Sequence, residues 1–265
     1  MSRVLSALPV FTPAEFEHFQ RDGYAIVRGL VARSRCEQLK ARARRDLAAQ
    51  AAPLEFEAQV KYPGAPGSLD APGGRTVRRL LQACARDPLY REWATSPAVA
   101  QRLRQLLGPD IALSQAHHNC IMTKNPAFSS ATGWHQDIRY WAFEKPELVS
   151  TWLALGSERE DNGCLWLVPG SHKLELRREQ YDENLFLRTD LEESRGILQR
   201  KIAAELDEGD ALFFHCRVLH AAGRNLTGLT KFAAVFTYHA EGNRALPGTR
   251  SAALPEIPLS PQAST

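Results

Sequence analysis

The amino-acid sequence predicts a mainly β protein with helices in its N-terminal part. Helix start and stop signals concentrate before residue 110. From residue 111 onward, short runs rich in Val, Leu, Phe, Trp and Thr alternate with Gly, Pro, Asn and Asp. Many short strands separated by turn residues favour a β-sandwich or a β-barrel. The hydrophobic content of 44% and charged content of 24% are those of an ordinary globular protein.

The first helix signals lie in residues 12–50. Thr12, Pro13 and Glu15 form a capping box with proline at the first helical position, which predicts a helix that ends near Gly23. A short strand is expected at 24–27. A second capping box at residues 34–37 predicts a helix that runs to about Gln50.

Residues 61–75 are rich in proline and glycine and predict a loop. Asp87 and Ser96 each precede a proline and resemble helix caps, and the second helix should end at Gly108. The strands are then expected at about 111–123, 134–138, 149–155, 164–168, 197–205, 210–215 and 231–239. The proline-containing tail from Ala245 is expected to form a poorly ordered surface segment.

Composition excludes several function classes. A net charge of +3 does not indicate the concentrated basic face of a nucleic-acid-binding protein. Because no run of 18 apolar residues occurs, we expect no membrane span, and the N-terminus has no targeting pattern. The five cysteines include no C-x-x-C pair, so neither a disulfide framework nor a zinc knuckle is predicted, and a cytoplasmic location is expected.

The clearest chemical signal is the pair His135 and Asp137. On an extended strand, residues two apart point to the same face. An imidazole and a carboxylate on one face are two-thirds of a facial triad for a redox-active divalent metal, most often Fe(II). His220, which follows the apolar run 211–214, is the best candidate for the third ligand.

An ordered set of motifs resembles the phytanoyl-CoA dioxygenase family, which belongs to the Fe(II)- and 2-oxoglutarate-dependent oxygenases. The set consists of Trp-His-Gln-Asp at 134–137, Trp-Leu-Ala-Leu at 152–155, Asn-Gly-Cys-Leu-Trp-Leu-Val-Pro-Gly-Ser-His at 162–172, Gly-Asp at 209–210, and the later His215, His220 and Asn225. The resemblance implies a double-stranded β-helix, also called a jelly roll, of the cupin kind. We therefore expect one domain over 1–265, with a helical part at about 1–110, a jelly-roll core at about 111–240 and a C-terminal tail at 241–265.

The resemblance also implies the chemistry. His135, Asp137 and His220 are expected to be the catalytic iron ligands, with 2-oxoglutarate as co-substrate, O₂ as oxidant, and succinate and CO₂ as products. Since Asp137 fills the position at which a Gly or Ala would leave room for a halide, hydroxylation or a related oxidation is favoured over halogenation.

The co-substrate site departs from the family pattern. The family has an arginine about eleven residues after the distal histidine, with Ser or Thr four residues earlier. This chain has Thr227 in place but Lys231 at the arginine position. Lysine supplies a point charge in place of two parallel hydrogen bonds, so it either serves with weaker affinity or indicates an altered pocket. Lys124 and Trp152 are expected to contact the keto acid.

The substrate is expected to be a small organic molecule, with no nucleic-acid, membrane or obligate protein partner. Gln115, on one strand face with His117 and Asn119, is a candidate pocket residue, and Arg139 and Trp141 follow the metal motif closely. Two other functions stay open. Lys231 is compatible with a cupin-like metal-dependent oxygenase that uses no keto acid, and a catalytically silent metal-binding homologue is the third possibility.

Overall fold

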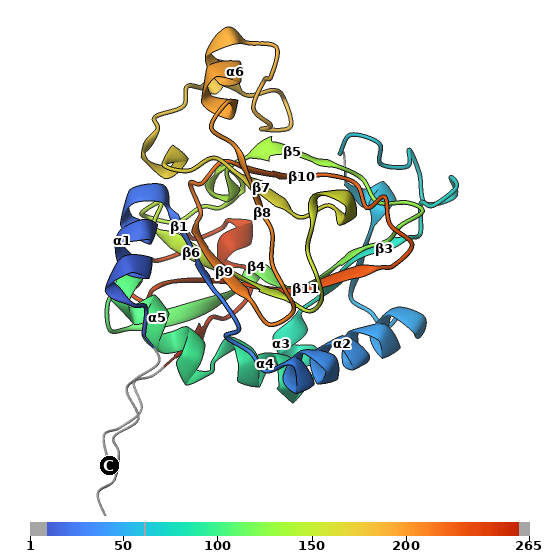
Figure 1. Ribbon diagram of the computed structural model, residues 1–265, viewed down its shortest axis with the longest axis horizontal. Coiled ribbons are helices and arrows are strands. Elements are labelled where there is room, and N and C mark those ends of the chain that lie inside the picture. The colour runs from blue at the N-terminus through green and yellow to red at the C-terminus, as the bar shows by residue number, and fades with distance from the viewer. Residues whose placement is uncertain (1–9, 61, 260–265) are drawn as a thin grey trace, which may run out of the picture.

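Two antiparallel sheets face each other in the computed structural model, which describes residues 10–60 and 62–259 (Figure 1). The larger sheet has the order β1 (Tyr24–Val27), β9 (Ala211–His215), β6 (Leu148–Ala154), β11 (Lys231–Ala240), β4 (Ile111–Lys124), β3 (Val77–Leu81) and β2 (Leu54–Phe56), and β12 (Ile257–Pro258) pairs with β4. The smaller sheet has the order β5 (Thr132–His135), β10 (His220–Ala222), β7 (Leu165–Leu167) and β8 (Ile202–Ala204). The predicted double-stranded β-helix is confirmed.

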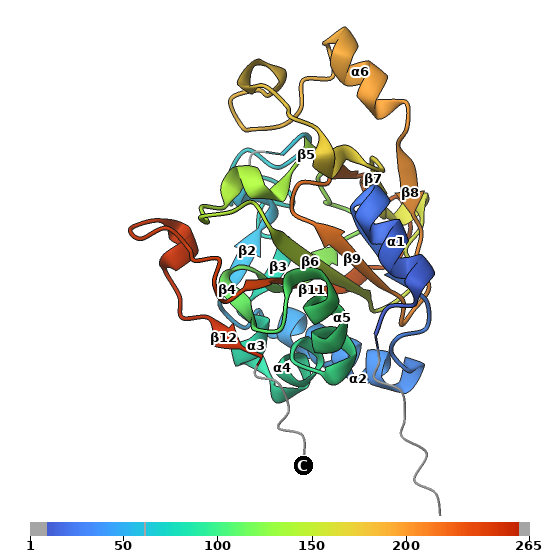
Figure 2. The same cartoon turned by 90° about the vertical axis from the view of Figure 1, so that its left-hand side faces the viewer.

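Helices cover the face of the larger sheet that points away from the smaller one, as Figures 1 and 2 show for α2 to α5. The helices are α1 (Pro13–Asp22), α2 (Arg33–Ala48), α3 (Ala83–Arg86), α4 (Pro88–Ala94) and α5 (Pro97–Leu107), with α6 (Glu192–Leu198) beyond the smaller sheet. Leu39, Tyr90 and Leu103 from these helices are fully buried in one core with Phe213 and Phe236 of the sheet. This core supports the outer face of the larger sheet and leaves its inner face to the second cluster, between the sheets.

The helix predictions are confirmed at α1, α4 and α5 and need one correction at α2. Thr12 accepts from the backbone N–H of Glu15 at 3.3 Å, and the Glu15 carboxylate accepts from Thr12 N–H at 2.7 Å. The second capping box does not exist, because α2 begins at Arg33 and Ser34 lies inside the helix. Ala32 takes the cap position without a side-chain bond.

The predicted boundary near residue 110 does not separate helices from strands. The chain before it contributes β1, β2 and β3 to the larger sheet, and β2 and β3 were not predicted. Charged residues in β2 and β3 obscure the alternation of apolar and polar residues that would predict a strand. The expected strand at 197–205 is only partly right, because α6 continues to Leu198 and β8 covers Ile202–Ala204.

The C-terminal segment is more ordered than the sequence predicted. Ile257 pairs with Leu113 of β4, and the backbone N–H of Leu259 donates to the carbonyl of Ile111 at 2.8 Å. Both Ile257 and Leu259 are buried. The prediction of a poorly ordered tail is therefore wrong up to Leu259, and residues 260–265 lie outside the described part of the chain. No helix in the described ranges has the length and apolar character needed to cross a membrane.

A tight turn before β9 ties the sheet to the start of α2. Asp210 accepts from Arg28 at 2.6 Å and from the backbone N–H of Gly29 at 2.8 Å. The neighbouring Gly209 has φ +93°, and a Cβ there would lie 2.2 Å from the carbonyl oxygen of Val31. Only glycine therefore fits this turn without displacement of the backbone.

We predict that Gly209→Ala lowers the free energy of unfolding by at least about 2 kcal/mol, because it adds a backbone clash to left-handed strain. Gly29→Ala is the matched control, since Gly29 has φ +58° but a Cβ added there would meet no described residue within 4 Å. It should cost only about 1 kcal/mol. Urea denaturation of both variants measures the difference, and equal losses would contradict the clash.

Candidate active site

Three ligand-type side chains converge at one end of the smaller sheet. His220 of β10 is paired directly opposite His135 of β5 in the antiparallel ladder. Asp137 Oδ1 lies 3.6 Å from His135 Nε2 and 3.7 Å from His220 Nε2. All three side chains are buried, and their ligand atoms lie within 4.8 Å of one another. The structure therefore brings together the three residues that the sequence singled out.

The local backbone differs from the expected one. β5 ends at His135, and Asp137 begins the 3₁₀-helix η2 (Asp137–Tyr140), so the two do not share an extended strand. Gln136 between them is extended and faces away, with its Nε2 donating to the carbonyl of Arg217 at 2.6 Å. The N–H of Ile138 donates to the carbonyl of Cys216 at 3.1 Å, which fixes the start of η2. These bonds hold the turn that keeps Asp137 beside His135.

The tautomers of both histidines suit metal binding. His135 Nδ1 donates to the carbonyl of Gly133 at 2.8 Å, and His220 Nδ1 donates to the carbonyl of Val218 at 3.0 Å. Because a carbonyl only accepts, each Nδ1 carries the proton and each Nε2 presents its lone pair. Burial, with repulsion from His135, lowers the pKa of His220 to about 4, so its ring is neutral at pH 7. Two imidazoles that present Nε2 and a carboxylate fit Fe(II).

His118 of β4 supports the third ligand. Its Nε2 donates to Asp137 Oδ2 at 3.3 Å, which leaves Oδ1 directed at the two histidines. Burial alone would raise the pKa of Asp137, but His118 and His220 outweigh it and hold that pKa well below its usual range. His118 was not predicted from the sequence, because the expected pocket residues Gln115, His117 and Asn119 lie on the opposite face of β4. Lys124 is an even number of residues away on the same strand, and this alternation was the available signal.

A cavity between the two sheets begins at these three ligands. Its lining residues from the larger sheet come from β3, β4, β6, β9 and β11: Arg78, Arg79, His118, Met122, Thr123, Lys124, Trp152, Phe214, Lys231 and Ala233. Aromatic rings lie around His135. Phe186 and Tyr140 make edge contacts with it, at ring-centroid distances of 5.8 and 5.9 Å, and Tyr62 stands against Phe186 at 5.4 Å. Sequence analysis did not identify Tyr62 or Phe186.

Three of the cationic side chains that line the cavity have carboxylate partners. Lys231 Nζ lies 2.9 Å from Glu158 Oε2. Arg79 Nε lies 3.4 Å from Glu55 Oε1. These ion pairs reduce the cost of burying cations between the sheets.

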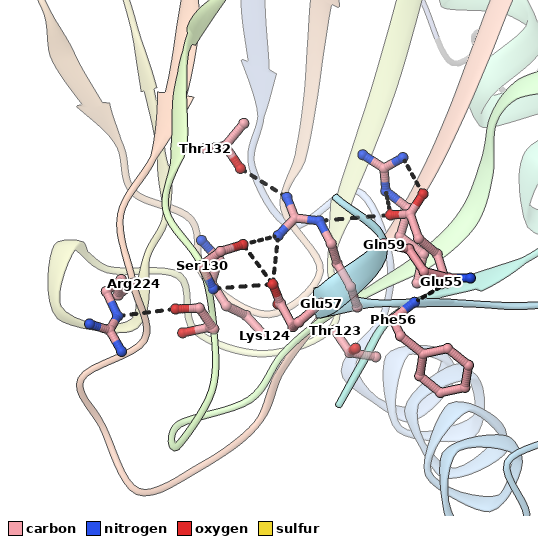
Figure 3. A network of polar contacts seen from close by, with 12 residues as sticks. Glu55, Phe56, Glu57, Gln59, Thr123, Lys124, Ser130, Thr132 and Arg224 are labelled. Carbon is pink, nitrogen blue, oxygen red and sulfur yellow. Dashed lines mark hydrogen bonds and ion pairs between the residues drawn. The ribbon is translucent and has the colours of Figure 1, made fainter. Parts of the chain in front are cut away.

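The third pair, Arg78 with Glu57, lies at the edge of the cavity where the turn after β2 meets β5. Its Nη1 is 3.5 Å from Glu57 Oε2. Figure 3 shows Glu57 beside Ser130, whose hydroxyl donates to Glu57 at 2.6 Å. The Arg78 guanidinium also donates to Ser130 and to Thr132, each at 2.9 Å. The Arg78 charge is therefore paired with a carboxylate within this network.

Lys124 differs from these three. Among the described residues its ammonium has no carboxylate partner and donates to the carbonyl of Gly223. Burial, together with repulsion from Lys231 and Arg78, lowers the pKa of Lys124 to about 7. A buried ammonium with a carbonyl as its acceptor is a fitting partner for the carboxylate of a bound molecule.

The predicted co-substrate contacts are partly brought together. Lys124, Trp152 and Lys231 line the cavity, but Thr227 does not. The Thr227 hydroxyl donates to Asn225 Oδ1 at 2.7 Å, in a loop whose tip, Leu226 and Leu229, is exposed. The Thr227 side chain therefore stabilises its own turn, and the expectation that it helps to bind the co-substrate stays a prediction.

The predicted substrate contacts also lie elsewhere. Gln115 Nε2 donates to the carbonyl of Pro255 at 2.6 Å and so anchors the C-terminal segment. Arg139 donates to the carbonyl of Leu176 at 2.8 Å. Trp141 is stacked on His117, at a centroid distance of 4.7 Å. None of the three lines the cavity, and their role as substrate contacts stays a prediction.

A family comparison agrees with this geometry. The model of the family described as "Phytanoyl-CoA dioxygenase (PhyH)" matches residues 19–233. The chain belongs to this family. The match includes β1 to β10 and the three candidate metal ligands His135, Asp137 and His220.

Individual relatives are more distant. The chain is 27% identical to the "Probable phytanoyl-CoA dioxygenase" of Caenorhabditis elegans over 58% of its own length, and 27% identical to the human "Phytanoyl-CoA dioxygenase, peroxisomal" over 59%. It spans about half the length of these relatives, 52% and 47%. The ectoine dioxygenase of Sphingopyxis alaskensis is 24% identical, with 85% of this chain and 75% of the relative covered.

Solved structures share the fold. EctD from S. alaskensis with 2-oxoglutarate and 5-hydroxyectoine gives a TM-score of 0.75 at 22% identity and covers 92% of this chain and 81% of its own. The epimerase SnoN in complex with Fe³⁺, alpha ketoglutarate and nogalamycin RO gives 0.70 at 21% identity and covers 94% of both chains.

We predict that His118→Gln weakens metal binding by about 10-fold to 100-fold, because the oriented carboxylate of Asp137 loses its imidazole partner. His117→Gln is the matched control, since His117 is the adjacent residue of β4 but hydrogen-bonds to Ser251 instead. Its metal affinity should be unchanged. Calorimetric titration with Mn(II) measures both, and equal affinities in the two variants would contradict a supporting role for His118.

Proposed function

We propose that the protein is a non-haem Fe(II)- and 2-oxoglutarate-dependent dioxygenase that hydroxylates or otherwise oxidises a small organic substrate. The observation that carries the proposal is the buried triad of His135, Asp137 and His220. The triad lines a cavity that Lys124 also lines. The family membership supports it, as do similar solved structures that contain iron or 2-oxoglutarate. An Fe(II) ion held by these three residues would supply the redox chemistry with which O₂ oxidises the keto acid to succinate and CO₂.

The chain's own residues have distinct tasks in this proposal. His135, Asp137 and His220 hold the metal on one face, and His118 orients Asp137. Lys124 receives the far carboxylate of 2-oxoglutarate, and Trp152 forms a wall of the same cavity. The rings of Tyr62, Tyr140 and Phe186 bound the space near His135, where they exclude water and give an apolar surface to the substrate.

The charge of Lys124 favours this function over a cupin-like oxygenase that uses no keto acid. A protein with no dicarboxylate co-substrate would gain nothing from a buried ammonium without a counter-ion, which destabilises the fold. The catalytically silent homologue is disfavoured because a triad with three protein ligands leaves coordination positions open.

We also infer that the protein works in a reducing compartment and propose the cytoplasm. All five cysteines are buried and free of disulfide bonds. Free thiols are typical of reducing compartments. The proposed partner is a small-molecule substrate, and neither a nucleic acid nor a membrane is part of the proposal.

The reaction is tested by succinate formation. Wild-type protein with Fe(II), ascorbate and 2-oxoglutarate should release succinate in air, slowly even before its substrate is known. Asp137→Ala should reduce this release to the level of a protein-free blank, because the metal loses its anionic ligand. His117→Gln should retain the wild-type rate. Iron-independent succinate release, or none from the wild type, would contradict the proposal.

The role proposed for Lys124 predicts a pH dependence. Since the carboxylate needs the charged ammonium, and the pKa of free Lys124 is about 7, affinity for 2-oxoglutarate should fall above pH 7 by up to about tenfold per pH unit. Lys124→Arg stays charged and should flatten this profile. Pyruvate, which has no far carboxylate, should give a flat profile with both proteins. Calorimetry on the Mn(II) form measures the affinities, and an unchanged slope in Lys124→Arg would contradict the assignment.

A further inference from the structure

Glu158 is a fully buried carboxylate that contacts two residues lining the cavity, Trp152 and Lys231. Its Oε1 accepts from the indole Nε1 of Trp152 at 2.7 Å, and its Oε2 lies 2.9 Å from Lys231 Nζ. Two backbone hydrogen bonds with Leu206, at 2.8 and 3.1 Å, hold Glu158 in place. The carboxylate is therefore fixed by bonds on both oxygens and on its main chain.

We propose that Glu158 determines the co-substrate preference of the cavity, because its carboxylate binds Lys231 and leaves the far carboxylate of the keto acid to Lys124. This inference rests on the proposed function. Glu158 belongs to no sequence motif. It contacts Lys231, which stands at the position where the family carries an arginine.

Two of the three N–H donors of Lys231 are already in use. Its ammonium donates to Glu158 Oε2 and to the carbonyl of Gly163, each at 2.9 Å. A second carboxylate brought to Lys231 would approach Glu158, and repulsion between like charges in a buried site opposes that approach. The ion pair of Lys231 and Glu158 therefore has no net charge, and Trp152 lies beside it.

The charges around the cavity lead to the same conclusion. Of the Lys and Arg side chains that line it in the described ranges, Arg78, Arg79 and Lys231 each have a carboxylate within 4.0 Å. Lys124 has the carbonyl of Gly223. The balance is one positive charge without a counter-ion, which matches one far carboxylate of a dicarboxylate keto acid.

The two lysines are held apart by the turn at Gly163. This residue has φ +75°, and a Cβ there would lie 2.8 Å from Lys124 Cδ and 2.6 Å from the carbonyl oxygen of Gly223. Its own carbonyl accepts from Lys231. Glycine at this turn therefore lets Lys124 pass close to the backbone, while the carbonyl keeps Lys231 directed at Glu158.

The test compares 2-oxoglutarate with pyruvate, which binds a metal through the same keto-acid group but has no far carboxylate. Calorimetry on the Mn(II) form at about pH 6.5 gives both Kd values. Glu158→Gln should tighten 2-oxoglutarate by roughly tenfold and leave pyruvate unchanged, because Lys231 becomes a second available cation. An unchanged or weaker Kd for 2-oxoglutarate would overturn the proposal.

A charge-balanced pair of variants supplies the second arm. Lys231→Met leaves Glu158 without its partner and should weaken 2-oxoglutarate by more than about tenfold. Adding Glu158→Gln removes that charge, so the double variant should return to within about threefold of the wild type. If the double variant binds as weakly as Lys231→Met, Lys231 itself contacts the keto acid and the proposal fails.

The same titrations separate this inference from the function on which it rests. Wild-type protein that binds neither keto acid would overturn both. Wild-type protein that binds both, with no response to Glu158→Gln, would overturn only the role of Glu158. Thermal unfolding followed by circular dichroism, with the pyruvate Kd, verifies that each variant keeps its fold and metal site.

Discussion

The cross-strand pair of His135 and His220 is the contact on which the site depends. Antiparallel pairing of β5 with β10 places the two rings 4.1 Å apart, from positions eighty-five residues apart in the chain. The turn into η2 then adds Asp137 to the same point. A one-residue slip of the ladder would send one ring to the other face, so the register of two short strands decides whether a metal can bind.

The larger sheet gives this pair its surroundings. Its outer face is fixed by the core under α2 to α5, and its inner face presents a polar row to the cavity. Buried cations are expensive unless paired, and the carboxylates of Glu55, Glu57 and Glu158 neutralise most of them. The exception, Lys124, is therefore the position at which a ligand can contribute the missing charge.

Much of this arrangement could be predicted from the sequence. The H-x-D pair and the distal histidine were recognisable as local patterns, although Asp137 begins a 3₁₀-helix and does not share an extended strand with His135. The same patterns did not locate β2 and β3, because Glu55, Arg78 and Arg79 make these strands look like a solvated loop. Their charges are paired with one another across the sheet, which no local pattern reveals.

The long-range partners were equally hidden. Glu158 meets Lys231 across 73 residues, and Gln115 meets Pro255 across 140. Local spacing carries no information on such pairs. Face assignment on β4 was ambiguous for a different reason, since both His117 and His118 are polar and each finds buried partners on its own side.

X-ray absorption at the iron edge of the anaerobic Fe(II) protein tests the central claim most directly. The account predicts scattering from two imidazoles with oxygen or nitrogen ligands in the remaining positions, and the loss of one imidazole in His220→Ala. Addition of 2-oxoglutarate should leave both imidazoles in place. Sulfur ligands from the buried cysteines, or a spectrum that His220→Ala does not change, would contradict the account.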